Sequence, residues 1–297
     1  RRHKVDAAIF FSDIVIPLKL AGIDVDIVAG VGPVMGEAIR TAEQVRNLPD
    51  LDPAALAPII ETVGIVTSEL YTTPLIGFAG APFTLASYLV EGRPSREYLH
   101  TKALMREEPE TWHALLSWVA NVTGTFLRTQ AIAGASALQL FDSWAGALTL
   151  DEYQTFVAPH SAAVMSMVDD LPVPRIHFGT KTGHLLVAMR DVGATVVGVD
   201  QFTPLDVAND MLGGTTPLQG NIDPMVLFAN PEQIDAAVQQ VLASFGTPHT
   251  DPSTTGPTHI FNLGHGINQL TPPENVAALV EAVHKHSRAM RDVTEKV

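Results

Sequence analysis

A single carboxylate ends an almost wholly apolar run near the start of the sequence. The run, residues 6–13, reads Asp-Ala-Ala-Ile-Phe-Phe-Ser-Asp and has the length of a β-strand. In a parallel α/β protein such a run is a strand covered on both faces, and ligands bind at its carboxyl end. Asp13 is therefore a candidate for acid–base or electrostatic chemistry. An Asp in this position also commonly caps the following helix, so both interpretations stand.

Two other polar residues follow predicted strands. Ser143 comes after the strand-like run 137–141, where a serine can cap the next helix. His265 lies between two glycines after the run 259–263, where it fits a turn with a hydrogen-bonded histidine. Position alone gives neither residue a function.

Strand-like and helix-like segments alternate along the chain. Besides the run ending at Asp13, strands are predicted at 74–79, 137–141, 174–178, 195–199, 217–220 and 259–263, with a small hairpin or excursion at 25–33. Helices are predicted at 14–21, 58–70, 95–133 with a new start at Pro109, 183–189, 205–212, 232–245 and 274–290. Thr149 and Glu152 match a capping box, while Thr203, Asn230 and Thr271 each precede a Pro in a helix-capping position. This rhythm is typical of right-handed βα repeats.

The repeats favour a TIM (β/α)8 barrel that forms one catalytic domain over residues 1–297. About seven strand–helix units can be counted, whereas a closed barrel of this class has eight. The last unit is complete through its helix, and the chain opens only a few residues ahead of a strand. The sequence therefore predicts that an N-terminal βα unit is absent from these residues.

Composition narrows the classes of function. A hydrophobic content of 46% with 17% charged residues indicates a large core. The absence of cysteine excludes disulfides, thiolate zinc sites and thiol nucleophiles, and a net charge of −14 argues against a nucleic-acid partner. No apolar run reaches about 18 residues, and no signal-peptide pattern opens the chain. These two observations predict a soluble, cytoplasmic protein without a membrane partner.

Two patterns that suggest cofactors are discounted. The segment Gly30-Val31-Gly32-Pro33 lacks the strand–helix context of a dinucleotide fingerprint. His284 and His286 are two residues apart on a predicted helix and cannot share a face, so they do not form a metal pair.

Five segments at strand ends together resemble the uroporphyrinogen decarboxylase family. They occur in that family's order and span essentially the whole chain. They are Phe11-Ser12-Asp13-Ile14, Gly77-Phe78-Ala79-Gly80-Ala81-Pro82-Phe83-Thr84 with Tyr88-Leu89-Val90-Glu91-Gly92, Gln139-Leu140-Phe141-Asp142-Ser143, Gln219-Gly220-Asn221-Ile222-Asp223-Pro224 and Asn262-Leu263-Gly264-His265-Gly266.

The resemblance implies a single-domain barrel, usually a homodimer, that needs no metal or organic cofactor. It implies removal of the four acetate carboxyl groups of uroporphyrinogen III to give coproporphyrinogen III, on the route to haem. Asp13 matches the family's essential aspartate and Tyr88 the tyrosine beside it. The other residues implied to bind substrate are Ser143, His265 and the apolar wall residues Ile9, Phe78 and Phe141.

The implied chemistry gives Asp13 a definite task. A pyrrole acetate can lose carbon dioxide when its ring is first protonated at carbon, because the cationic ring then takes up the electrons. A carboxylate facing the four pyrrole N–H groups would accept their hydrogen bonds and stabilise that cation. Apolar Phe10 and Phe11 beside Asp13 would strengthen the interaction by lowering the local dielectric constant.

Two features of the sequence depart from the family's pattern, and two alternative functions are considered. The family carries an Arg-Gln-x-x-x-Arg stretch that contacts substrate carboxylates, and no such stretch occurs in these residues; Trp144 also stands where some relatives carry histidine. A corrinoid-dependent methyltransferase shares the barrel, but its zinc ligand set typically includes cysteine, which this chain lacks. A non-catalytic tetrapyrrole-binding barrel is the other alternative.

Overall fold

The computed structural model describes residues 2–246 and 258–294; the remainder of the predicted 1–297 domain lies outside this description. Its centre is a parallel sheet of seven strands in the order β1-β4-β5-β6-β7-β8-β9. The strands are β1 (Ala8–Ile9), β4 (Leu75–Gly80), β5 (Ala137–Asp142), β6 (Arg175–Gly179), β7 (Val196–Gly198), β8 (Leu218–Ile222) and β9 (His259–Leu263). These are the seven strands predicted from the sequence, and the α/β architecture is confirmed.

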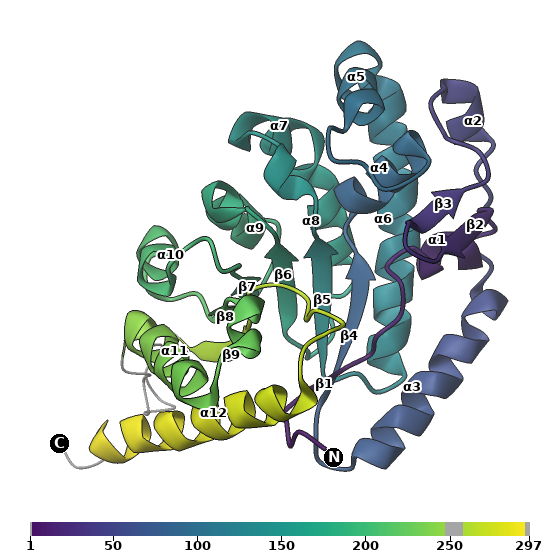
Figure 1. Cartoon of the computed structure of the whole chain (residues 1–297). Helices are drawn as coiled ribbons and strands as arrows, with labels where there is room; N and C mark the ends of the chain where they lie inside the picture. Colours follow the sequence, from purple (N-terminus) through teal and green to yellow (C-terminus); the bar gives the residue numbers. More distant parts are fainter. Residues whose placement is uncertain (1, 247–257, 295–297) are drawn as a thin grey trace.

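The sheet curls, and its helices lie on the outer side. In Figure 1 the strands turn from the upright β4, β5 and β6 to the nearly horizontal β9. The helices are α1 (Ile16–Leu20), α2 (Ala42–Arg46), α3 (Ala57–Leu70), α4 (Pro82–Glu91), α5 (Leu99–Glu107), α6 (Pro109–Ile132), α7 (Leu150–Phe156), α8 (Ala158–Ser166), α9 (Leu186–Asp191), α10 (Leu205–Met211), α11 (Pro231–Phe245) and α12 (Pro273–Thr294). A two-stranded antiparallel excursion, β2 (Val25–Val28) with β3 (Gly32–Met35), confirms the predicted hairpin.

Side chains point alternately to the two faces of the sheet, which divides the core into an outer and an inner layer. Ala79 of β4 packs outward in a cluster with Ala120 and Leu127 of α6. Its neighbour Phe78 points the other way, and its ring lies 5.8 Å from that of Phe141 on β5. Side chains of successive strand residues point to opposite faces, so the even-numbered positions of β4 line the inside of the curl.

The two edge strands differ from the rest of the sheet. Every residue of β8 is buried, whereas β9 alternates between intermediate and exposed positions. Ile9 on β1 is 41% exposed, and Phe11 just beyond it is 86% exposed. The described residues thus form an incompletely closed parallel barrel of seven strands, with β1 and β9 at its edges.

One helical segment passes a test of length and composition for a membrane span. Residues Pro53–Leu70 are long and apolar enough, by length and composition, to pass as a membrane span, and only 11% of this window is buried. The segment contains Glu61 and Glu69, so its apolar residues do not form one uninterrupted run. A single helix of this kind is weak evidence for a membrane span. Val63 of α3 is fully buried and packs in a cluster with Phe10 and Phe78.

The predicted helix caps were partly right. The capping box of Thr149 and Glu152 and the Asn230 cap are both present. Thr203 does not cap α10, whose N-cap residue is the extended Pro204. Thr271 fails because α12 begins at Pro273: the second proline of the pair holds Pro272 away from helical backbone angles.

Candidate active site

Asp13 lies just past the carboxyl end of β1 and is partly buried. Its Oδ1 accepts a hydrogen bond from the backbone N–H of Val15 at 3.1 Å, at the start of α1. This contact closes a turn ahead of α1: the N-cap residue of that helix is Val15, with no side-chain cap bond, so Asp13 does not cap the helix. Burial and, second to it, the negative charge of Asp13 raise the pKa of Tyr88, so Asp13 acts on that phenol as well.

Tyr88 of α4 forms an aromatic wall with Trp144 and Tyr98. Its ring stacks on Trp144 with centroids 4.1 Å apart, and Tyr98 meets Trp144 edge-on at 5.3 Å. Tyr88 is 9% exposed, and burial, with Asp13 second, raises its pKa to about 12. The phenol is therefore a hydrogen-bond donor at neutral pH, and its ring cannot turn without displacing Trp144.

Ser143 stands at the carboxyl end of β5, in the loop that carries Trp144. Its backbone carbonyl accepts a 2.6 Å hydrogen bond from the Thr180 hydroxyl. The short helix that follows has Trp144 as its N-cap residue and no side-chain cap bond, so Ser143 does not serve as that helix's N-cap.

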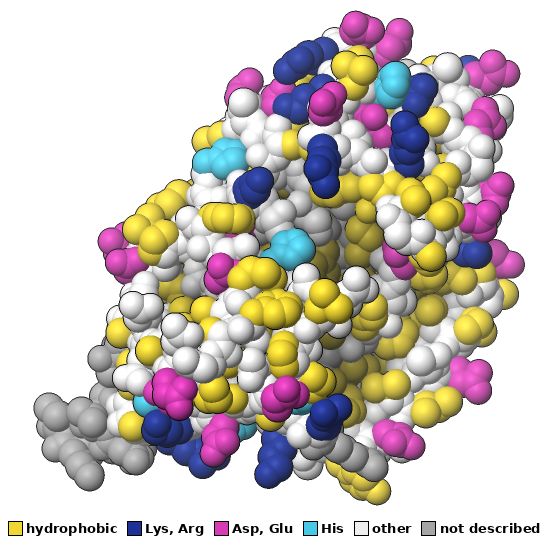
Figure 2. Space-filling model, in the orientation of Figure 1, with side chains coloured by type: hydrophobic (Ala, Val, Ile, Leu, Met, Phe, Trp, Pro, Cys, Tyr) yellow, Lys and Arg dark blue, Asp and Glu magenta, His cyan; other side chains and the backbone are white. Residues whose placement is uncertain are grey.

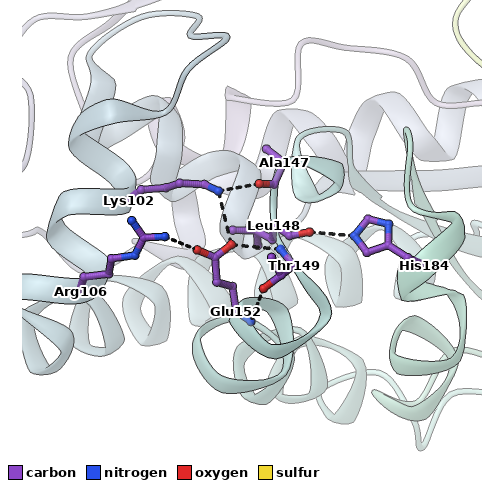
Figure 3. A network of polar contacts seen from close by, with 7 residues as sticks. All are labelled: Lys102, Arg106, Ala147, Leu148, Thr149, Glu152 and His184. Carbon is purple, nitrogen blue, oxygen red and sulfur yellow. Dashed lines mark hydrogen bonds and ion pairs between the residues drawn. The ribbon is translucent and has the colours of Figure 1, made fainter.

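A polar network fixes the far part of the same loop (Figure 3). Lys102 of α5 donates to the Ala147 carbonyl at 2.7 Å, and His184 lies 2.8 Å from the Leu148 carbonyl on the other side. Glu152 of α7 joins Lys102 at 3.3 Å and Arg106 at 2.7 Å. The loop bearing Ser143 and Trp144 is consequently held from two helices.

A buried carboxylate that the sequence analysis did not single out lies behind this loop. Asp142 has no exposed surface, and its Oδ1 accepts a 2.9 Å hydrogen bond from the Thr84 hydroxyl. Thr84 also accepts a 3.3 Å bond from the backbone N–H of Trp144. Because Thr84 lies one turn before Tyr88 on α4, this node ties α4 to the β5 loop. The Asp at a strand end, the signal used for Asp13, could have identified it.

The predicted apolar wall residues do not share one environment. Phe78 is 3% exposed, and Phe141 contacts both Phe78 and Phe178, whose centroid lies 5.7 Å away. Phe11, two residues beyond β1, stacks over Phe78 at 6.4 Å, so its ring joins those of β4, β5 and β6 along the inside of the sheet. Ile9 lies on the open edge instead and is largely accessible.

His265 lies in the turn after β9 and is exposed. Gly264 before it contacts the backbone of Gln201, which follows β7, and a side chain at Gly264 would collide there. This close approach draws the turn toward the loop after β7. His265 therefore sits at the same carboxyl rim as Asp13 and Ser143, but no hydrogen bond to its ring is found among the described residues.

These elements surround a hollow face. In Figure 2 the surface is recessed at its centre, and hydrophobic side chains line much of the recess. Within the described ranges, no group of three or more His, Asp or Glu side chains could hold a metal ion. The arrangement offers a carboxylate, a protonated phenol and apolar walls, which suit a cationic intermediate formed on a large flat ligand.

Comparison with known proteins agrees with this chemistry. The family model described as "Uroporphyrinogen decarboxylase (URO-D)" matches residues 1–286. A protein of Arthrobacter sp. (strain FB24) named uroporphyrinogen decarboxylase is 56% identical over 287 residues, 97% of this chain and 81% of that protein. A protein of the same name from Rhodococcus jostii (strain RHA1) is 56% identical over 284 residues, 96% of this chain and 79% of that protein.

Solved structures of low sequence identity share the fold. A methyltransferase from Methanosarcina mazei has a TM-score of 0.79 at 16% identity, covering 96% of this chain and 82% of that one. At this identity the likeness shows the fold alone. The family match and the close relatives establish more: the chain belongs to the uroporphyrinogen decarboxylase family.

Proposed function

We propose that this protein decarboxylates the four acetate side chains of uroporphyrinogen III and releases coproporphyrinogen III. The observation that carries the proposal is the pairing of Asp13 with Tyr88 at the carboxyl rim, in a chain that belongs to this family. The proposed enzyme is a carboxy-lyase that uses no metal or organic cofactor.

Asp13 is the proposed central catalytic residue. Its carboxylate accepts hydrogen bonds from the pyrrole N–H groups and stabilises the ring protonated at carbon, a charge that is absent in the ground state. The ring cation then receives the electrons of the breaking bond between the acetate methylene and its carboxyl group, and carbon dioxide leaves. A proton then takes the place of carbon dioxide on the methylene carbon, and the ring carbon releases the proton that it accepted at the start, which restores the pyrrole.

The other predicted residues have supporting roles in the proposal. Tyr88 donates from its protonated phenol, and Ser143 and His265 offer polar contacts around the rim. Phe78 and Phe141, with Ile9 at the edge, supply the apolar surface against which the macrocycle packs. The four-ring lining supports this assignment.

Two alternatives would leave the same fold with another task. A methyltransferase is favoured by one structural neighbour, but its likeness extends to the fold only. A non-catalytic tetrapyrrole-binding barrel would need the hollow without the carboxylate. Measuring carbon dioxide release and coproporphyrin formation separates these functions, because a binding protein would hold the tetrapyrrole without turnover and a methyltransferase would release no carbon dioxide.

The test is anaerobic incubation of the protein with uroporphyrinogen III, followed by oxidation and chromatography of the porphyrins. Coproporphyrin formation, with intermediates of seven, six and five carboxyl groups, is expected. The Arthrobacter relative serves as the positive control. Activity in the relative and none in this chain under several conditions would overturn the proposal.

We further propose that an eighth βα unit, preceding residue 1, closes a single barrel domain between β1 and β9. The exposed edges of these two strands support it, since parallel barrels leave no strand unpaired. A homodimer and a cytoplasmic location complete the proposal; light scattering and cell fractionation test them.

A further inference from the structure

The loops that follow β6 and β7 are fastened to each other at the carboxyl rim. The Asp200 carboxylate is 2% exposed and accepts the backbone N–H of Lys181, while its Oδ1 accepts that of Phe202 at 3.1 Å. Asn221 of β8 donates to the carbonyl of Asp200 at 2.9 Å and to that of Thr203 at 2.6 Å. Three consecutive strand ends are thereby joined through buried polar groups.

The hydrogen bonds of Asp200 and Asn221, together called the clamp below, hold Lys181 in an unusual backbone conformation. Its φ of 57° lies in the left-handed region, which residues other than glycine, asparagine and aspartate seldom adopt. Such a conformation persists only where the surroundings enforce it, and such residues cluster at sites that clamp ligands. Here the enforcing contacts are the Asp200 bond and the neighbouring Thr180 hydroxyl, which bonds the Ser143 carbonyl.

The clamp places Lys181 between the two polar residues of the proposed site. On one side the backbone of Thr180 and Lys181 contacts Gly146, a position where any side chain would collide. On the other side Gln201 touches Gly264, next to His265. The lysine thus occupies the rim between the Ser143 loop and the His265 turn.

The ammonium group of Lys181 has no carboxylate partner among the described residues, in contrast to Lys102 and Lys285. It lies 5.9 Å from the ring centre of Phe202, a contact that orients it without neutralising its charge. The side chain is exposed in a protein of net charge −14. An anionic substrate would be repelled by the protein as a whole, so a local unpaired cation at the rim has a clear electrostatic use.

We propose that Lys181 binds a side-chain carboxylate of the tetrapyrrole substrate. This inference rests on the proposed function, because that substrate carries eight carboxylates around its periphery. When the inner nitrogens of the macrocycle face Asp13, the carboxylates of the substrate extend outward to the rim. Lys181 is a binding residue in this account and takes no part in the breaking of bonds.

The test compares Lys181→Met with Lys181→Arg and with Lys285→Met, which removes one positive charge from α12, whose Lys285 is paired with Asp235. Lys181→Met should raise KM on the order of tenfold with little change in kcat, the loss expected for one charge-assisted hydrogen bond. Lys181→Arg should recover most of the affinity, and Lys285→Met should behave like the unaltered protein. An unchanged KM in Lys181→Met, with turnover intact in the unaltered protein, would overturn this inference alone.

Binding measurements identify the carboxylate and separate this inference from the proposed function. Fluorescence titration with uroporphyrin and coproporphyrin, the oxidised forms, reports affinity without turnover. Weaker binding of both porphyrins to Lys181→Met assigns a propionate contact, and weaker binding of uroporphyrin alone assigns an acetate; either outcome supports the inference. If the unaltered protein neither binds uroporphyrin nor forms coproporphyrin, the proposed function fails first.

Discussion

At the scale of the residue, Asp13 combines a local structural contact with a charge that acts on its neighbour. One carboxylate oxygen accepts the Val15 N–H, and the charge as a whole still acts on Tyr88. The contact within this turn fixes the orientation of the carboxylate, because a residue held by its own backbone turn has few other rotamers. A turn ahead of α1, rather than a helix cap, is here compatible with a preorganised catalytic charge.

Asp13→Asn separates the two tasks. The amide oxygen can still accept the Val15 hydrogen bond, so the folded state should persist, while the negative charge is lost. Turnover should fall by about 10²- to 10³-fold, corresponding to about 3–4 kcal/mol by analogy with an oxyanion-hole donor. Steady-state kinetics together with a urea titration check both parts. Near-normal kcat in a folded variant would remove Asp13 from the mechanism.

Tyr88→Phe tests the phenol with little change in packing. The phenyl ring should keep its stack on Trp144, and the loss of one hydrogen bond should lower kcat/KM roughly tenfold. The folded pKa of about 12 means that the phenol stays protonated up to strongly alkaline pH. The pH–rate profile between pH 6 and 9 should therefore have the same shape in both proteins. A limb that disappears in Tyr88→Phe would contradict this role.

At the scale of the element, the Thr84–Asp142 node joins α4 to the β5 loop. Among the residues that the structure describes, Asp142 Oδ2 has no hydrogen-bond partner, and Nε2 of buried His177 lies 3.9 Å from it. Thr84→Val is nearly isosteric and should cost about 1–3 kcal/mol of unfolding free energy, because it deprives a buried carboxylate of its donor. Thr62→Val on exposed α3 is the matched control and should change stability by less than about 0.5 kcal/mol. If the two variants unfold at the same urea concentration, the Thr84–Asp142 hydrogen bond does not stabilise the fold.

A second contact between elements, from α6 to α8, should make stability depend on pH. His113 Nδ1 lies 2.8 Å from His160 Nε2, and burial, with His113 second, lowers the pKa of His160 to about 4. The unfolded state, with a pKa near 6.5, therefore takes up the proton first. The stability that this group contributes is complete above pH 6.5 and is lost as the pH falls toward 4, by about 2 kcal/mol at pH 5.

His160→Gln should remove this part of the pH dependence. The difference in unfolding free energy between pH 7.5 and pH 5 should be smaller in the variant than in the unaltered protein. His100→Gln, at an exposed position of α5, controls for the loss of a histidine. If all three proteins lose the same stability between these pH values, the buried pair is not responsible.

The elements were largely predictable because their signals are local. Apolar runs of strand length marked all seven strands, and the new helix start at Pro109 was right. What the sequence could not supply were contacts between distant segments. Asp142 gains its importance only when Thr84 and Trp144 meet it, and the left-handed Lys181 has no signature in its own residue type. Predicted caps failed where a proline competed with the capping residue, as at Thr271.

At the scale of the whole molecule, the two edges of the sheet carry backbone groups without a strand partner among the described residues. The residues of β1 and β9 offer backbone groups on one side only, beside the exposed apolar side chains Ile9, Phe11 and Ile260. An edge of this kind is a template for another strand, and an eighth βα unit and a second copy of the chain are the two candidate occupants. These occupants predict different concentration dependence.

Hydrogen exchange of the backbone amides distinguishes the occupants. In this chain the amides of β5 and β6, which are paired on both sides, should exchange most slowly, and those of β1 and β9 should exchange faster. Adding a preceding βα segment should slow exchange in both edge strands together, at every protein concentration. Protection that appears in this chain only at high concentration would indicate edge-to-edge pairing of two copies. Because the Asp13 carboxylate lies just past the end of β1, closing that edge should also raise turnover. An extension that protects both edge strands without raising turnover would show that barrel closure and catalysis are separate.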